Sequence, residues 1–80
     1  TIAYYETLIE MLFFEEKYTD VVEIYQKLNK LKMTSVKYKT VELIAISYLN
    51  LNNITAGCYF AQVLRDNNQK YSSMIDLVCK

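Results

Sequence analysis

Apolar residues recur along the chain with the spacing of one face of an α-helix. In the first segment, Tyr5, Leu8, Ile9 and Leu12 follow the i, i+3, i+4, i+7 pattern. Comparable stripes follow in four further segments, and short polar stretches such as 15–17 and 50–53 separate them. The pattern predicts helices over residues 3–15, 19–31, 37–50, 55–66 and 72–79.

The composition supports an all-helical chain. Of the 80 residues, 52% are hydrophobic, and the chain has no proline and a single glycine, Gly57. A β-rich domain needs many turns, which glycine and proline usually make, so their scarcity argues against one. The apolar stripes predict a core made of Leu8, Leu12, Val21, Ile24, Tyr25, Leu28, Ile44, Ala45, Phe60 and Leu64. So much apolar side chain exceeds what one small core can hide, and we expect the rest to face neighbouring repeats or a partner.

The segments recur at a nearly constant period. Tyr5, Tyr38 and Tyr71 lie 33 residues apart and open the first, third and fifth predicted helices. The stripe of the second helix recurs in the fourth at an offset of 36 residues. Two helices per 33–36 residues is typical of an α-solenoid. We therefore predict an all-α segment of an α-solenoid, with two antiparallel helical hairpins and the first helix of a third. Its repeats would span about 3–36, 37–69 and, in part, 70–80 of a longer array. The alternative is a plain helical domain in which the tyrosine spacing arises by chance.

Two stretches carry a resemblance to a known repeat. Residues 5–9 read Tyr-Glu-Thr-Leu-Ile, and residues 71–75 read Tyr-Ser-Ser-Met-Ile. The chain resembles the pentatricopeptide repeat, a helical hairpin of about 35 residues whose first helix opens with tyrosine and Thr-Leu-Ile. The second unit keeps the opening tyrosine but has Glu42 where isoleucine is usual. The alternative family is the tetratricopeptide repeat, to which the Tyr-Thr-Asp-Val stretch at residues 18–21 is similar.

The resemblance implies a function in RNA binding. Pentatricopeptide proteins are organellar, and the implied role is mitochondrial transcript processing, stability or translation, or association with the mitochondrial ribosome. Two polar residues per repeat read one base of single-stranded RNA. Carried onto this chain, the first reading positions are Glu6, Lys39 and Ser72, and the closing positions are Val36 and Asn67. Only Ser72 and Asn67 are of the usual residue types. The tetratricopeptide alternative implies a protein-interaction scaffold instead.

The charge pattern adds a candidate site for phosphate contacts. The net charge is zero, but residues 24–41 hold five lysines and no acid. Lys32, Lys37 and Lys39 near the unit boundary are candidates to contact an RNA backbone. The competing interpretation is solvated lysines at a helix end, which the helix dipole favours.

The sequence offers little for catalysis, metal binding or membrane insertion. It contains no histidine, no glycine-rich phosphate loop and no run of about 18 apolar residues. Cys58 and Cys79 lie in apolar stretches without metal-binding spacing, and we expect two buried, reduced thiols in a reducing intracellular compartment. The sequence therefore predicts neither an enzyme nor a bound cofactor or metal, but a binding protein for RNA or another protein.

Overall fold

The computed structural model describes residues 1–31 and 35–79, and within them the chain is helical without a strand. The helices are α1 (Ile2–Phe14), α2 (Tyr18–Asn29), α3 (Tyr38–Asn50), α4 (Ile54–Asp66) and α5 (Ser73–Val78). Each end lies within two residues of the sequence prediction, because the helical spacing of apolar residues is a local signal. The all-helical class predicted from the sequence is therefore confirmed.

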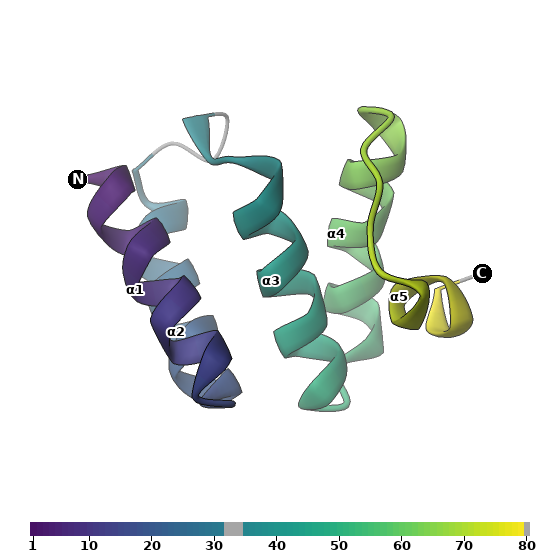
Figure 1. Cartoon of the computed structure of the whole chain (residues 1–80), viewed down its shortest axis with the longest axis horizontal. Coiled ribbons are helices and arrows are strands. Elements are labelled where there is room, and N and C mark those ends of the chain that lie inside the picture. Colours follow the sequence, from purple (N-terminus) through teal and green to yellow (C-terminus); the bar gives the residue numbers. More distant parts are fainter. Residues whose placement is uncertain (32–34, 80) are drawn as a thin grey trace.

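The first four helices form two antiparallel hairpins that lie beside each other (Figure 1). α1 pairs with α2 and α3 pairs with α4, while α3 also packs against both helices of the first hairpin. After α4 the chain runs back along that helix before α5, which packs against α4 at the opposite end of the molecule from α1 (Figure 1).

The core lies between these helices and matches the predicted stripes. Of the ten predicted core residues, six are buried and the other four, Leu8, Leu12, Ile24 and Tyr25, are half-buried. On α1 the fully buried residue is Ile9. The helical phase read from the sequence is thus correct, although α1, the outermost helix, is covered on one side only.

The two hairpins repeat each other at an offset of 36 residues. α3 starts 36 residues after α1 (Ile2, Tyr38), and α4 starts 36 residues after α2 (Tyr18, Ile54). Even the turn inside each hairpin recurs. Lys17 N–H donates to Leu12 O at 2.9 Å, and Asn53 N–H donates to Tyr48 O at 2.9 Å. Both bonds belong to the Schellman closure of a helix end, in which one residue adopts a left-handed conformation. Those left-handed residues are Glu16 (φ 59°) and Asn52 (φ 62°), again 36 residues apart.

This offset corrects the register inferred from the tyrosines. Tyr5 is the fourth residue of α1, whereas Tyr38 is the first residue of α3 and Tyr71 precedes α5. The three tyrosines therefore do not occupy equivalent positions. The tyrosines are 33 residues apart, whereas α1 and α3 start 36 residues apart. The two spacings differ because each tyrosine lies at a different position relative to the start of its helix. The offset of 36 residues seen in the second helices applies to the first helices as well.

The single glycine marks a close approach of α3 and α4. A Cβ atom built on Gly57 would lie 2.5 Å from Leu49 Cδ2, 2.7 Å from Leu49 Cγ and 3.2 Å from the Ala45 carbonyl oxygen. Val21 occupies the equivalent position on α2 and is fully buried. The packing of α3 on α4 in the second hairpin therefore depends on the absence of a side chain at Gly57.

A disulfide anchors α5, and the expectation of reduced thiols is wrong. Cys58 on α4 and Cys79 after α5 are bonded through their Sγ atoms, although 21 residues separate them in sequence. Arg65 on α4 reinforces the junction. Its Nε donates to the Tyr71 hydroxyl at 2.7 Å, and its guanidinium also donates to the carbonyl oxygen of Cys79. The two cysteines meet because the chain turns back after α4, a tertiary feature that their spacing in sequence does not show.

Candidate functional site

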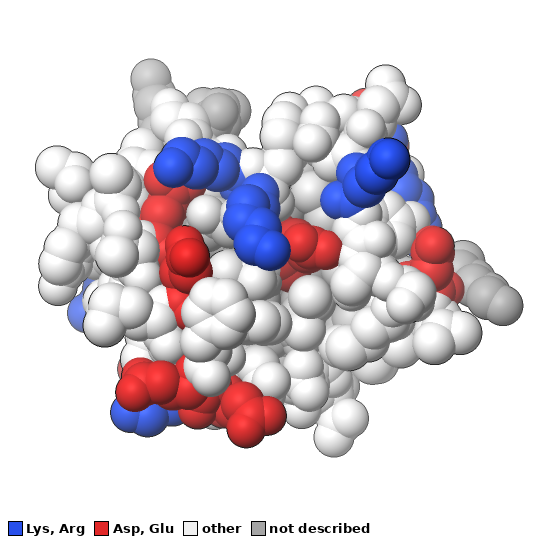
Figure 2. Space-filling model, in the orientation of Figure 1, with Lys and Arg blue, Asp and Glu red and all other residues white. Residues whose placement is uncertain are grey.

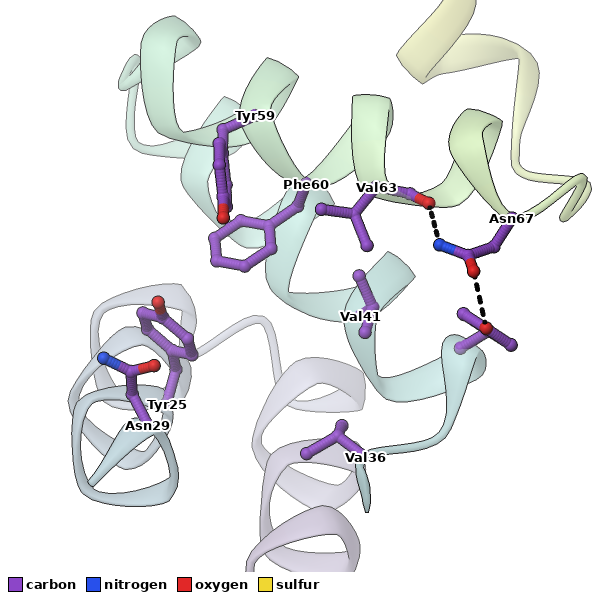
Figure 3. A pocket seen from close by; sticks show the side chains of 9 residues that line it. Tyr25, Asn29, Val36, Val41, Tyr59, Phe60, Val63 and Asn67 are labelled. Carbon is purple, nitrogen blue, oxygen red and sulfur yellow. Dashed lines mark hydrogen bonds between the residues drawn. The ribbon is translucent and has the colours of Figure 1, made fainter. Parts of the chain in front are cut away.

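A pocket of about 450 Å³ opens between the two hairpins (Figure 3). α2, α4 and the beginning of α3 each contribute to its wall, and Val36 and Val41 form part of its apolar lining. The full set of lining residues is Tyr25, Asn29, Val36, Tyr38, Val41, Tyr59, Phe60, Val63 and Asn67. None of these side chains carries a formal charge at neutral pH, so the pocket suits an uncharged, partly apolar group.

Aromatic rings form one wall of the pocket. Tyr25 meets Phe60 edge-to-face with ring centroids 5.1 Å apart, and Tyr59 meets Phe60 in the same way at 5.1 Å. Behind them the Tyr48 ring stacks on Phe60. Burial, and then the neighbouring Tyr59 hydroxyl, raises the pKa of Tyr25 above its ordinary value. The Tyr59 ring is 64% exposed, so it offers an open aromatic face beside a rigid aromatic wall.

Two amide side chains stand at opposite sides of the pocket. The carbonyl oxygen of Asn67 accepts a hydrogen bond from the Tyr38 hydroxyl at 3.0 Å, and its Nδ2 donates to Val63 O at 2.8 Å (Figure 3). These bonds hold the Asn67 amide in a fixed orientation. Asn29 lies exposed beside Tyr25 at the end of α2 (Figure 3). A ligand in the pocket would therefore meet hydrogen-bonding groups at its edges and aromatic rings at its face.

Two of the predicted lysines, Lys37 and Lys39, lie on either side of Tyr38 at the start of α3. On the face shown in Figure 2, basic and acidic side chains lie next to one another. Lys39 Nζ lies 3.8 Å from a Glu42 carboxylate oxygen. The backbone N–H of Lys37 donates to the Glu6 carboxylate at 2.7 Å, while its side chain is exposed. Lys32 lies outside the described residues. The acids therefore reduce the positive potential that Lys37 and Lys39 present to a phosphate.

Glu6 and Ser72, the first reading positions of the first and third units, make contacts within the fold. Glu6, the first reading position of the first unit, accepts hydrogen bonds from the Lys37 N–H and from the Thr40 hydroxyl at 3.2 Å. Ser72 donates its backbone N–H to Glu42 at 2.8 Å, and among the described residues its Oγ is buried without a hydrogen-bond partner. Of the positions carried over from the resemblance, Val36 and Asn67 line the pocket, and Asn67 is the one of a usual base-reading type.

Sequence reasoning missed Asn29 and Tyr59 as candidate site residues. Their signal is a helical spacing of four: Tyr25 and Asn29 share one face of α2, and Tyr59, Val63 and Asn67 share one face of α4. The spacing identifies the two faces, but it does not show that they border the same pocket. That relationship depends on how the hairpins pack.

Residues 1–31 and 35–79 show neither a membrane-crossing helix nor a metal site. No helix there has both the length and the apolar character that a membrane crossing needs. The same residues contain no group of three or more histidine, cysteine, aspartate or glutamate side chains placed to hold a metal ion.

In comparisons with known proteins, no family model, no curated protein and no solved structure matches the chain.

Proposed function

We propose that the chain is a binding module of a helical-hairpin array, and not an enzyme, and that its pocket between α2 and α4 holds one unpaired base of single-stranded RNA. The observation that carries the proposal is the pairing of the exposed Tyr59 side chain with the oriented Asn67 amide in an uncharged pocket. Stacking on aromatic side chains and hydrogen bonding to exposed base edges are how proteins recognise single-stranded RNA.

The dimensions of the pocket support this ligand. Its 450 Å³ lies within the range of pockets that take small planar molecules, about 300–1,000 Å³. Asn29 and Asn67 line the two sides of the pocket and offer hydrogen-bonding groups to the edge of a base held there. Asn67 thus keeps the base-reading role that the resemblance implies, while the buried Ser72 hydroxyl is not offered to a ligand in this conformation.

Lys37 and Lys39 supply the backbone contacts in this proposal. Both lie at the start of α3, beside Tyr38, which lines the pocket. A strand whose base enters the pocket would pass this end of α3, where the lysine side chains are exposed. Phosphate contacts of this kind position a strand without reading its sequence.

A mitochondrial location, with a role in transcript processing, stability or translation, is part of the proposal and rests on the resemblance to pentatricopeptide repeats. The Cys58–Cys79 disulfide adds one requirement, since such bonds form where thiols can be oxidised. The chain must therefore pass through or reside in a compartment that permits oxidation.

One observation favours a second candidate function, a protein-interaction scaffold. The residues that line the pocket carry no charge, and Lys39 is paired with Glu42, so an apolar or aromatic side chain of a partner protein would also fit. In that case the pocket would bind a peptide segment, and the lysines would serve solubility.

The test is a titration of labelled single-stranded RNA with the chain, at several salt concentrations. Replacing Tyr59 with alanine should weaken binding by about 5- to 160-fold, the range for loss of one stacked base. Replacing Lys32, Lys37 and Lys39 together should weaken binding for all sequences alike and flatten the log–log salt dependence by about two units. Asn67→Ala should instead change which base is preferred.

Tyr4→Ala is the matched control, because Tyr4 is an equally exposed tyrosine on α1, away from the pocket. It should leave RNA affinity unchanged. If Tyr59→Ala and the triple lysine variant both bind RNA as the unmodified chain does, the RNA proposal fails and the protein scaffold takes its place.

A further inference from the structure

α3 buries two of its faces, and they have different partners. The face with Ala45 and Leu49 packs on α4 at the glycine contact described above. A second face carries Thr40, Ile44 and Ser47, spaced i, i+4, i+7, and all three are at most 5% exposed. This second face lies against the first hairpin: α3 packs on α1 and α2, and the Thr40 hydroxyl donates to a carboxylate of α1.

The equivalent face of α1 is uncovered. Because the hairpins repeat at 36 residues, the positions of Thr40, Ile44 and Ser47 correspond to Tyr4, Leu8 and Met11. Tyr4 is 62% exposed and Met11 is 59% exposed, and Leu8 is half-buried. These side chains are larger and more apolar than the threonine and serine buried on α3. An apolar stripe of this kind on the outer side of a helix indicates a contact surface.

We propose that this face, which we call the α1 outer face (Tyr4, Leu8 and Met11), docks a further helical hairpin in the way that α3 docks the hairpin of α1 and α2. The inference rests on the hairpin array proposed above and not on RNA binding, so a chain that binds no RNA can still pass its test. The partner is defined by its chemistry: two antiparallel helices that bury an apolar face against α1.

A carboxylate on the partner would fit the start of α1, where the Thr1 side chain accepts from the Tyr4 N–H and no acid is present in the first turn. The carboxylate of Glu6 caps the start of α3 by accepting from the Lys37 N–H, and Glu42 caps the start of α5 through the Ser72 N–H. At the start of α1 the equivalent position is Thr1, and the first turn of α1 holds no acidic residue. A carboxylate from the docked hairpin at this end of α1 would oppose the positive end of the helix dipole.

A second copy of this chain does not present that partner. Its second hairpin has a face able to receive a helix and a capping acid, Glu42, but α5 already lies against α4 and takes the Glu42 cap. The disulfide between Cys58 and Cys79 holds α5 in place. The occupant we infer is therefore a separate hairpin unit with a free face, and not a second copy.

The test adds such a unit to the whole chain. An extra copy of residues 1–36 is placed directly before Thr1, which preserves the spacing between hairpins. The added copy carries Met11→Leu, so that only the original Met11 reports. The rate at which hydrogen peroxide oxidises the original Met11 should fall several-fold relative to the unextended chain, because the oxidation rate of a methionine follows its solvent exposure. Met74, which is half-buried in both proteins, serves as the internal reference.

Variants of the extended chain separate the contacts. Tyr4→Lys with Thr7→Lys in the original copy should restore the rate of the unextended chain, because Tyr4 and Thr7 correspond to Thr40 and Leu43, which are buried on α3. Ala3→Lys should not restore it, because Ala3 corresponds to Lys39, which is exposed on α3. Glu6→Ala in the added copy should raise the oxidation rate part of the way, through loss of the cap.

Two results would overturn the inference. One is a Met11 oxidation rate in the extended chain equal to that in the unextended chain. The other is a dimer of the unextended chain in sedimentation that Tyr4→Lys converts to a monomer, since a second copy would then cover the α1 outer face.

Discussion

The carboxylate of Glu6 accepts a hydrogen bond from the backbone N–H of Lys37 at 2.7 Å, across the boundary between the two hairpins. Lys37 is the N-cap residue of α3 and makes no side-chain capping bond of its own. The same relationship recurs at the next boundary, where Glu42 accepts from Ser72, the N-cap residue of α5. An acid in the first helix of one unit thus caps the first helix of the next. This contact sets the orientation of consecutive units as well as satisfying a free N–H group.

Removal of the Glu6 carboxylate should therefore destabilise the fold. Glu6→Ala is expected to lower the free energy of unfolding by about 1–2 kcal/mol, the range for loss of a helix cap made by a charged group. Urea unfolding followed by circular dichroism would measure it. Glu10→Ala is the control, because Glu10 is exposed on the same helix and should change stability by less than about 0.5 kcal/mol. Equal losses in the two variants would show that Glu6 has no capping role.

The helices and the hairpin pairs follow from the sequence because both depend on local patterns. The stripe of Val21, Ile24 and Leu28 determines the buried face of α2 whatever lies against it. The register of the repeat, by contrast, did not follow from the sequence. Tyrosine is a conspicuous residue, and its spacing of 33 residues masked the spacing of 36 that the helix starts share.

The contacts that the sequence did not predict join segments far apart in the chain. Nothing near Cys58 indicates that Cys79 comes within bonding distance, because this depends on the path of the chain after α4. The pocket is a similar case. Asn67 was a candidate through the resemblance alone, whereas its neighbour Tyr38 reaches it only after α3 and α4 have packed.

The turn after α1 should become more stable when Glu16 is replaced by asparagine, the residue at the equivalent position of the turn after α3. Glu16 has φ 59°, a left-handed conformation that costs energy for most side chains, and Asn52 adopts φ 62° at the equivalent position. Asparagine tolerates this conformation better, so Glu16→Asn should raise the free energy of unfolding by about 0.5–1 kcal/mol. The measurement is again urea unfolding. Glu15→Asn, one residue earlier at φ −86°, should give no such gain. A loss of stability on Glu16→Asn would contradict the interpretation.

The disulfide should stabilise mainly the attachment of α5. Cys58→Ser with Cys79→Ser removes a cross-link between residues 21 apart, for which loop closure predicts a cost of about 3 kcal/mol. Hydrogen exchange should be faster at the backbone N–H of residue 79, which in the unmodified chain bonds to Ile75 O at 2.8 Å, while the amides of α1 and α2 keep their protection. A reducing agent should have the same effect on the unmodified chain and none on the double variant. Uniform loss of protection along the chain would mean that α5 is part of one cooperative unit.

The close approach of α3 and α4 predicts that a larger residue at position 57 destabilises the chain, because the Leu49 side chain must shift to admit it. Alanine is the better helix former by about 1 kcal/mol, so an open site would be stabilised by Gly57→Ala. Here the new Cβ would lie 2.5 Å from Leu49 Cδ2, and Leu49 is itself buried. Overpacking of this kind costs about 1–3 kcal/mol, and we expect it to outweigh the gain in helix propensity.

The double variant Gly57→Ala with Leu49→Ala identifies the cause of that loss. Leu49→Ala removes the two atoms that meet the new Cβ, so the loss from Gly57→Ala should shrink or reverse when it is measured in that background. Thr55→Ala is the control for helix propensity, because Thr55 is exposed on the same helix. If Gly57→Ala destabilises the chain equally with and without Leu49, the clash lies at the Ala45 carbonyl oxygen, 3.2 Å away, and the distance between α3 and α4 is fixed by backbone contact.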